Sequence, residues 1–265
     1  MPMSAIYFQS SARSADGLQR SGNEDSAFIS GRLIAVADGM GGHAGGEVAS
    51  KIAIKALQKL SPVLTSSEID ADSIEDLLLH SLFTIDSQIG EYAEEVTELR
   101  GMGTTLTALL LVDANIALLH VGDSRCYRLR ANTLEQLSND HTVIQELLDQ
   151  GAISQSDVAD HPQRSVLTQA LMGQGTVTPI LQIYEVKEKD RYLLCSDGLS
   201  SVLTEKEIKS LLKKSDRSDA LKALIDATYI NGAPDNVTII VADIADITDG
   251  SPAQTAIEFF GTAAP

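Results

Sequence analysis

The chain has 265 residues, enough for one large domain or two small ones, and 43% of them are hydrophobic, as in an ordinary globular protein. It carries 37 Asp and Glu against 20 Lys and Arg, a formal net charge of -17. Binding to nucleic acid requires clustered Lys and Arg, and no such run occurs, so we expect no nucleic-acid partner. The acidic surplus indicates a solubilising surface, with a remainder available to gather around metal ions.

Short β-rich runs dominate the first part and the middle of the chain. Their patterning predicts strands at Ile6–Ser10, Ser26–Ser30, Leu33–Ala37, Thr104–Val112, Ile116–Val121, Cys126–Arg130, Ile180–Val186, Tyr192–Cys195 and Val237–Ala242. The sequence VDAN at residues 112–115 separates two apolar runs and predicts a hairpin turn.

Helical periodicity appears in blocks and does not alternate with each strand. In the first block an apolar residue recurs every fourth position, at Val48, Ile52, Ala56 and Leu60. A second helix is predicted over residues 73–96, and Thr204 with Glu207 forms a capping box before another helical segment. Clustered strands with segregated helix pairs predict an α+β fold, in which sheets pack together with helices outside.

The location and the ends of the chain give further expectations. The two cysteines, Cys126 and Cys195, lie in apolar strand-like runs, which is typical of buried thiols in a reducing compartment. The N-terminus has no continuous apolar segment of a secretory signal, and the longest apolar stretch, residues 106–121, contains Asp113 and Asn115. We expect a soluble cytoplasmic protein without a membrane segment, and a tail that is loosely held or a linker stub.

The sequence VADGMGGHAGGEVAS, residues 36–50, places Asp38 directly after an apolar run and before a glycine-rich turn. A phosphate-binding loop of the nucleotide type typically has a lysine followed by serine or threonine, and neither pair follows these glycines. A carboxylate at a strand end, on a backbone free to turn sharply, suits a hard cation better. The remaining ligands must then come from elsewhere in the chain.

Acidic turns of one form recur along the sequence. They are NED at residues 23–25, ADG at 37–39, GDS at 122–124, SDG at 196–198 and PDN at 234–236. Each adjoins a predicted strand, where a rigid scaffold can hold it. A single Asp-Gly or Asp-Asn is ordinarily only a turn, but five of them make a turn-only interpretation harder to sustain.

These motifs resemble, in order, those of the metal-dependent Ser/Thr protein phosphatases, the PPM or 2C-type family, in its compact bacterial form. The matching stretches are GLQRSGNED (17–25), residues 36–50, GMGTT (101–105), HVGDSRCYRL (120–129), PQRSVLTQAL (162–171), LLCSDGLS (193–200) and PDNVT (234–238). The resemblance implies a four-layer αββα sandwich, two mainly antiparallel sheets flanked by helix pairs. It places a phosphatase domain over 1–245 with a flap insertion at 138–164 that affects substrate choice, and a tail over 246–265.

The resemblance also implies a dinuclear metal centre. Asp38 would bridge two metal ions, and the Gly39 carbonyl would bind one of them. Asp197 and Asp235 would be ligands of the other ion. Oxygen-only ligands favour Mn²⁺ or Mg²⁺ over Zn²⁺, which ordinarily takes histidine or cysteine.

Further acidic residues and one arginine complete the implied site. Asp25 and Glu24 would hold metal-bound waters or coordinate in part, and Asp123 would join a third, weaker metal site. Arg20 would bind the substrate phosphate through its planar pair of donors. Two divalent ions about 3.5–4 Å apart can orient a water and lower its pKa, so a metal-bound water would hydrolyse phosphoserine or phosphothreonine without a phosphoenzyme intermediate.

Histidines and neighbouring ion pairs have less specific roles. His43 is the candidate for protonating the leaving group, and a local hydrogen bond in the turn is the competing and more ordinary role. We expect His120 to be a hydrogen-bonded core histidine. Asp140 is predicted to cap a helix, and Arg125 either supports Asp123 through an ion pair or contacts substrate.

Two other functions compete with a protein phosphatase. A catalytically silent domain of the same fold, used as a binding module, would be expected to lack a metal aspartate, and none is missing here. A hydrolase of small phosphate esters is the third hypothesis. For the phosphatase, the resemblance implies that phosphorylated proteins, Ser/Thr kinases and their substrates are partners; we expect a monomer.

Overall fold

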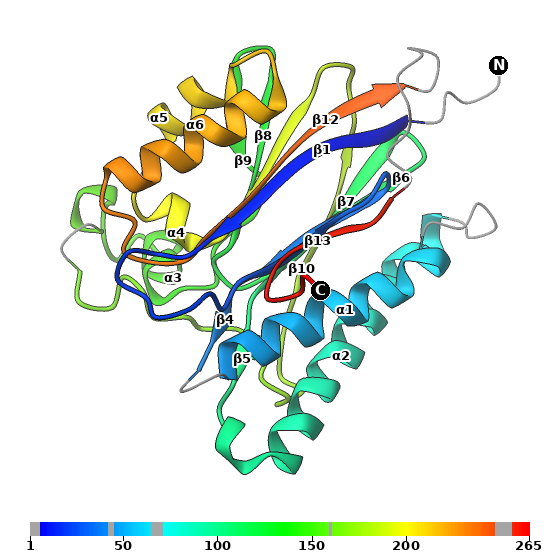
Figure 1. The fold of residues 1–265 in the computed structure, drawn as a ribbon, viewed down its shortest axis with the longest axis vertical. Coiled ribbons are helices and arrows are strands. Elements are labelled where there is room, and N and C mark those ends of the chain that lie inside the picture. The colour runs from blue at the N-terminus through cyan, green and yellow to red at the C-terminus, as the bar shows by residue number, and fades with distance from the viewer. Residues whose placement is uncertain (1–5, 42–44, 65–70, 159–160, 247–255) are drawn as a thin grey trace.

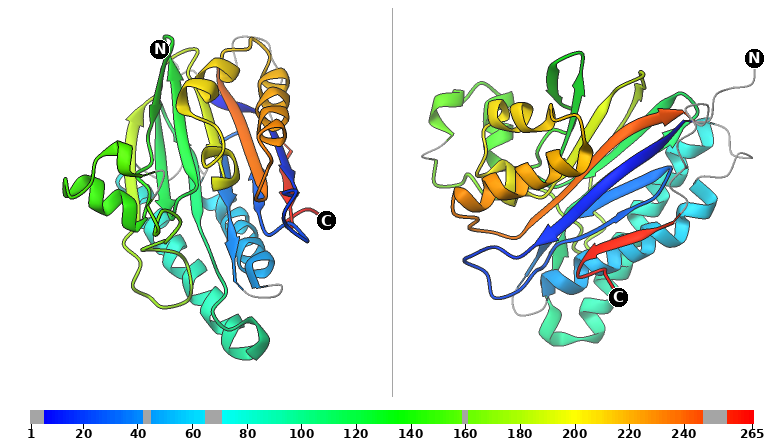
Figure 2. Two further views of the ribbon diagram at one scale, coloured as in Figure 1. Left: turned by 90° about the vertical axis from the view of Figure 1, so that its left-hand side faces the viewer. Right: turned by 45° about the horizontal axis from the view of Figure 1, so that its top comes forward.

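The computed structural model describes residues 6–41, 45–64, 71–158, 161–246 and 256–265, which form two antiparallel sheets between two helical layers (Figures 1 and 2). This arrangement confirms the predicted α+β sandwich. The predicted hairpin at residues 112–115 is also present, with Asp113 in a left-handed conformation at φ 51°. Within the described residues, no helix combines the length and the hydropathy that a membrane crossing requires.

The first sheet has the strand order β1-β12-β11-β8-β9. Its strands are β1 (Ile6–Ala15), β12 (Val237–Asp246), β11 (Arg191–Cys195), β8 (Arg125–Arg130) and β9 (Thr133–Gln136). The register of the β1–β12 pair runs from Ile6 opposite Asp246 to Ala15 opposite Val237. The end of β1 therefore lies beside the start of β12, which brings residues 16–25 next to residues 234–236.

The second sheet has the strand order β10-β7-β6-β3-β2-β13. Its strands are β10 (Ile180–Glu185), β7 (Asn115–Val121), β6 (Leu106–Val112), β3 (Leu33–Ala37), β2 (Ser26–Ile29) and β13 (Glu258–Gly261). The central strand β6 is buried along its whole length. Leu109 and Leu111 pack between the sheets, whereas Leu106 and Leu110 pack toward the helices, because successive side chains of a strand point to opposite faces.

Helices cover both outer faces of the sandwich (Figure 2). The second sheet carries α1 (Gly45–Leu64) and α2 (Ala71–Glu95), and the first carries α4 (Asp197–Ser200), α5 (Glu205–Leu212) and α6 (Arg217–Ile230). The helix α3 (Val143–Asp149) and two 3-10 turns, Thr97–Leu99 and Gln155–Asp157, lie in the connections. The predicted capping box of Thr204 and Glu207 is present at the start of α5.

The expectation of a loosely held tail is wrong for residues 258–261. They form β13, which pairs with β2 so that Phe259 lies opposite Phe28. The two rings are 6.3 Å apart, and the backbone N–H of Thr262 donates to the carbonyl of Asp25 at 2.9 Å. The C-terminal strand β13 therefore extends the second sheet directly behind the acidic turn that contains Asp25.

A small ladder lies beside the metal loop predicted around Asp38. Its strands are β4 (Gly39–Met40) and β5 (Gly103–Thr104), and Thr104 also exchanges backbone hydrogen bonds with Leu171. The loop after Leu171 is tied to α2 by Asp86, which is 2% exposed and whose carboxylate accepts three backbone N–H bonds at 2.8 to 2.9 Å. Nothing in the local sequence around Asp86 indicated this role.

Candidate metal centre

The acidic turns converge at one end of the sandwich. Burial and the charges of four neighbouring carboxylates raise the pKa of Asp38 well above its ordinary value. Those neighbours are Asp25, Asp197, Asp123 and Asp235. Five carboxylates from five separate turns thus lie close enough to repel one another.

Asp38 is influenced by all four of the other carboxylates, most strongly by Asp25 and Asp197. The backbone around it is held by two threonines of the β5–β6 segment. The Asp38 N–H donates to Thr105 Oγ1 at 2.9 Å, and the Asp38 carbonyl accepts from the Thr104 hydroxyl at 2.9 Å.

Glycine is required at position 39 because the backbone there packs closely against Gly46 and Glu24. A Cβ atom at this position would lie 2.1 Å from the carbonyl oxygen of Gly46 and 2.5 Å from that of Glu24. No side chain fits there, so the backbone after Asp38 can approach both the start of α1 and the turn containing Glu24.

Asp25 is the most deeply buried acidic residue of the group, with 1% of its surface exposed. Burial raises its pKa to about 7. The Ser196 hydroxyl donates to Oδ2 at 2.8 Å, whereas Oδ1 has no hydrogen-bond partner among the described residues. A buried oxygen of this kind needs a proton or a cation, which makes Asp25 suited to a metal centre.

Asp197 and Asp235 are brought together by close packing of their turns. Asp197 begins α4 directly after β11, and burial, followed by the charge of Asp235, raises its pKa to about 6. A Cβ atom on Gly198 would lie 1.9 Å from the carbonyl oxygen of Asn236, so only glycine allows the contact. Asp235 itself accepts a hydrogen bond from Arg20 Nη2 at 2.5 Å.

Asn236 is a site residue that the sequence analysis did not single out, although it belongs to the PDN motif. Its Oδ1 accepts from the backbone N–H of Glu24 at 3.0 Å, and its Nδ2 donates to the carbonyl of Gly22 at 2.9 Å. The side chain therefore fastens the turn containing Glu24 to the turn containing Asp235.

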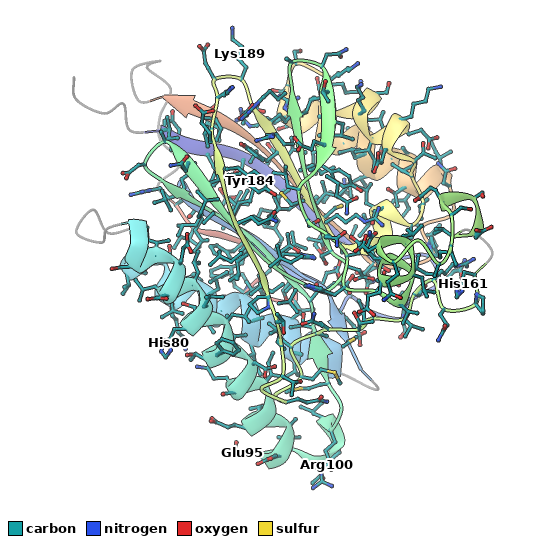
Figure 3. The ribbon with its side chains drawn as sticks, turned by 180° about the vertical axis from the view of Figure 1, so that it is seen from behind. His80, Glu95, Arg100, His161, Tyr184 and Lys189 are labelled. Carbon is teal, nitrogen blue, oxygen red and sulfur yellow. The ribbon has the colours of Figure 1, made fainter. Side chains whose placement is uncertain are left out.

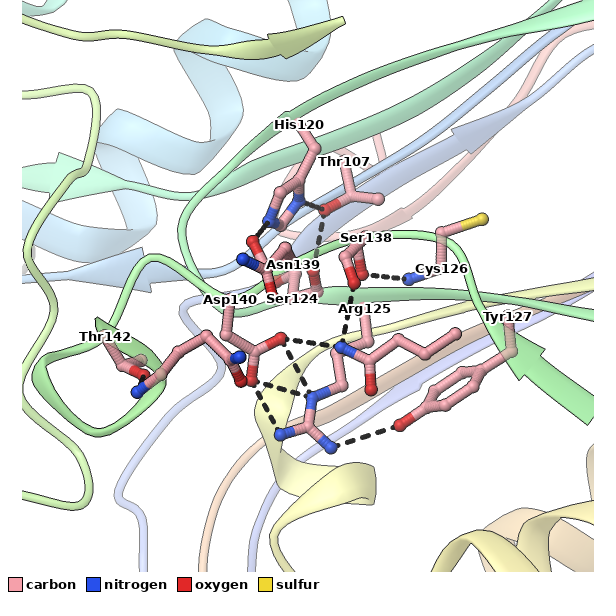
Figure 4. Close-up of polar contacts among 12 residues, drawn as sticks. Thr107, His120, Ser124, Arg125, Cys126, Tyr127, Ser138, Asn139, Asp140 and Thr142 are labelled. Atoms are coloured by element: carbon pink, nitrogen blue, oxygen red, sulfur yellow. Dashed lines mark hydrogen bonds and ion pairs between the residues drawn. The ribbon is translucent and has the colours of Figure 1, made fainter. Parts of the chain in front are cut away.

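Asp123 lies in the turn between β7 and β8, and burial raises its pKa to about 7. The predicted ion pair between Arg125 and Asp123 is not the contact that forms. Arg125 instead binds Asp140 through three hydrogen bonds of 2.6 to 3.1 Å, and donates to the Tyr127 hydroxyl at 3.2 Å (Figure 4). The predicted helix cap at Asp140 is also wrong, because Thr142 caps α3.

A buried chain of hydroxyl groups connects the turns of Asp38 and Asp123. The hydroxyl groups of Thr105 and Ser124 are 2.7 Å apart, and the Thr107 hydroxyl lies 2.9 Å from both the Ser124 carbonyl and His120 Nδ1 (Figure 4). His120 is fully buried, and its Nε2 lies 3.1 Å from the Asn139 carbonyl. The prediction of a hydrogen-bonded core histidine is confirmed.

His141 stacks on His120 and accepts from the backbone N–H of Gly122 at 3.0 Å, beside Asp123, whereas His80 and His161 lie apart from the acidic group. Figure 3 shows His80 on the outward face of α2 and His161 in the connection after α3, on opposite sides of the molecule. His43, the candidate proton donor, lies outside the described residues.

The donor set fits a hard divalent cation. Within the described part of the chain, no group of three or more His, Cys, Asp or Glu side chains is arranged so that it could hold a metal ion. Mg²⁺ ions are usually held by one or two carboxylates with several waters, and Mn²⁺ takes the same oxygen ligands. The oxygen donors of this group, which include the unpartnered Asp25 Oδ1, therefore fit Mg²⁺ or Mn²⁺ better than Zn²⁺.

Comparison with known proteins identifies a family whose solved structures share this fold. The protein phosphatase 2C family matches residues 20–231. The chain therefore belongs to the protein phosphatase 2C family, as the motif resemblance indicated.

Within the family the chain is similar to bacterial members. It is 42% identical to the serine/threonine protein phosphatase PstP of Mycobacterium tuberculosis over 92% of this chain and 46% of PstP, so it spans less than half of that relative's length. It is 39% identical to the serine/threonine phosphatase stp of Listeria welshimeri over 80% of this chain and 84% of that protein.

A solved structure of the family contains metal. The catalytic domain of PstP in complex with two manganese ions superposes with a TM-score of 0.82 at 40% identity, covering 91% of this chain and all of that domain.

Proposed function

We propose that this protein hydrolyses phosphoserine and phosphothreonine residues in proteins at a dinuclear Mn²⁺ or Mg²⁺ centre, by direct attack of water and without a phosphoenzyme intermediate. The observation that carries the proposal is the convergence of four carboxylates around that of Asp38, with Arg20 beside them, in a chain of the protein phosphatase 2C family. Two divalent cations supply Lewis acidity and a water of lowered pKa when they are bound.

We assign different carboxylates to the two ions. Asp38, on which all four other carboxylates act, is assigned to both ions, and the Gly39 carbonyl is assigned to one of them. Asp197 and Asp235, whose turns pack together, are assigned to the second ion. This assignment is supported by the mutual proximity of the groups and by the oxygen-only donor set.

Three further acidic residues are assigned to secondary roles at the metal centre. Asp25 has a buried Oδ1 without a partner among the described residues, and Glu24 lies on the turn that Asn236 holds. Asp123 is assigned to a third, weaker ion. The cluster around Arg125 and Asp140 fixes the segment that follows Asp123, because Arg125 begins β8 two residues later.

Arg20 is assigned to the substrate phosphate. Its side chain is 50% exposed, and among the described residues its ion pair is with Asp235, so the rest of the guanidinium can face a phosphoryl group. A guanidinium matches two phosphate oxygens at once, which orients the phosphorus atom for attack.

Arg20→Ala is expected to raise KM for p-nitrophenyl phosphate by about tenfold or more, since a lost charge-assisted hydrogen bond costs about 1.5–3 kcal/mol. Loss of an interaction present in both the bound substrate and the transition state raises KM with little change in kcat. Steady-state kinetics with Mn²⁺ will measure both constants. An unchanged KM would place this arginine outside the phosphate site.

Metal-stripped protein is expected to be inactive on a phosphothreonine peptide and to regain activity with Mn²⁺ or Mg²⁺ but not with Zn²⁺. The reason is that the carboxylate and carbonyl donors suit hard cations. Phosphate release from the peptide and from metabolite phosphates should be compared, since a clear preference for metabolites would favour a small-ester hydrolase. A folded protein that is inactive with every metal would indicate a binding module.

A further inference from the structure

A pocket of about 280 Å³ opens beside Arg20, between the turn of residues 20–24 and the start of α1. Its lining residues are Arg20, Ser21, Gly22, Asn23, Glu24, Gly41, Glu47 and Asn236. Sites for drug-sized ligands usually exceed about 300 Å³, so this volume suits a single long side chain. Of the charged lining residues, Arg20 and Glu24 have roles in the proposed hydrolysis, whereas Glu47 has none.

The walls of the pocket are held by hydrogen bonds and close packing. Asn236 bonds to both Gly22 and Glu24, and the Ser50 hydroxyl donates to the Glu24 carbonyl at 2.6 Å. A Cβ atom on Gly46 would lie 2.8 Å from the Glu24 carboxyl group, so the start of α1 packs directly against that side chain. A side chain entering the pocket would therefore meet a preformed surface.

The charges that face the pocket are mainly negative. Glu47 lies in the first turn of α1 and is exposed, and among the described residues none forms an ion pair or side-chain hydrogen bond with its carboxylate. Glu24 is close enough for the two carboxylates to repel each other. Among the described residues that line the pocket, Arg20 is the only cation, and it is already paired with Asp235.

We propose that this pocket receives a lysine or arginine side chain of the phosphoprotein, one or two residues from the phosphorylated residue, and that Glu47 is the carboxylate that selects it. The inference rests on the proposed function, because Arg20 must hold the phosphate for a neighbouring side chain to reach Glu47. A cationic side chain gains a charge-assisted hydrogen bond there, whereas an acidic one meets two like charges. Arg20 and Glu47 line the same pocket, and successive residues of an extended peptide lie about 3.3–3.6 Å apart, so we expect a residue one or two positions away to enter it.

The test uses three phosphothreonine peptides that are identical except for Lys, Ala or Glu at the two positions on each side of the phosphothreonine. With Mn²⁺, wild-type protein is expected to show a kcat/KM about fivefold higher for the Lys peptide than for the Glu peptide, the upper range for an exposed charge pair. Glu47→Gln should remove most of this preference, and Glu47→Lys should reverse it. Raising the salt concentration should weaken it.

Glu205→Lys is the matched control, because Glu205 is also an exposed glutamate in the first turn of a helix, and the substitution changes the net charge by the same amount. It should leave the ratio of Lys to Glu peptides as in wild type. The ratio is taken within each variant, so a general change in turnover cancels. Mn²⁺ binding measured by calorimetry adds a readout that does not depend on turnover.

The outcomes separate this inference from the proposed function. Equal rates for the three peptides in wild type, or an equal change in Glu205→Lys, would overturn the role of the pocket and leave the phosphatase intact. Weaker Mn²⁺ binding in Glu47→Gln with an unchanged peptide ratio would make the pocket a cation site instead. No hydrolysis of any peptide or of p-nitrophenyl phosphate would overturn the proposed function itself.

Discussion

Replacement of Asp38 by asparagine is expected to lower kcat/KM on a phosphothreonine peptide by more than about a hundredfold. Under the proposed function Asp38 is the ligand shared by both ions, and Asp25 and Asp197 are the two charges that act on it most strongly. Residues that only support metal ligands already change affinity or activity by about 10–100-fold, and a ligand shared by two ions should have a larger effect. The amide keeps the shape of the side chain but removes its charge.

The same substitution should leave the metal-free protein folded and raise its melting temperature. Four carboxylates act on Asp38, and an uncharged amide relieves that repulsion. Peptide kinetics, Mn²⁺ calorimetry and a thermal melt in chelator would test both halves of the expectation. Asp113→Asn is the control, because this exposed hairpin residue has φ 51°, a conformation that asparagine accepts. Normal turnover of folded Asp38→Asn would remove Asp38 from the ligand set.

Asp140→Ala is expected to destabilise the protein by about 3 kcal/mol or more and to lower its melting temperature by about 6–12 °C. The side chain of Asp140 is 7% exposed and that of Arg125 is 29% exposed, so removal of the carboxylate leaves a largely buried guanidinium without its partner. The Gln136 side chain, which donates to Asp140 at 3.0 Å, loses an acceptor as well.

A double variant distinguishes the unpaired charge from the loss of packing. Arg125→Leu combined with Asp140→Leu replaces both charges with apolar groups and should recover much of the lost stability, because the cost arises chiefly from a buried charge without a partner. Urea unfolding of the two variants would give both free energies of unfolding. If Asp140→Ala unfolds at the wild-type urea concentration, the ion pair does not support the turn that contains Asp123.

Short-range patterns were sufficient to predict the pieces of the site. Asp38 and Asp197 each follow a run of apolar residues and precede glycine, and both features lie within a few positions of the aspartate. The capping box of Thr204 and Glu207 is equally local, and it appears as predicted. Alternating apolar residues located most strands for the same reason. The motif series then indicated the family, because its order along the chain is specific.

Contacts between distant segments could not be predicted in this way. The partner of Arg125 turned out to be Asp140, and residues 258–261 joined the edge of a sheet at β2. Neither choice is encoded near the residues concerned, since an arginine pairs with whichever carboxylate the chain brings within reach, and an apolar strand pairs with whichever edge is open. The pocket beside Glu47 likewise exists only because the register of β1 and β12 sets Asn236 against the turn of Glu24. Local sequence thus determined which groups could act as ligands, whereas strand order and register determined which of them meet.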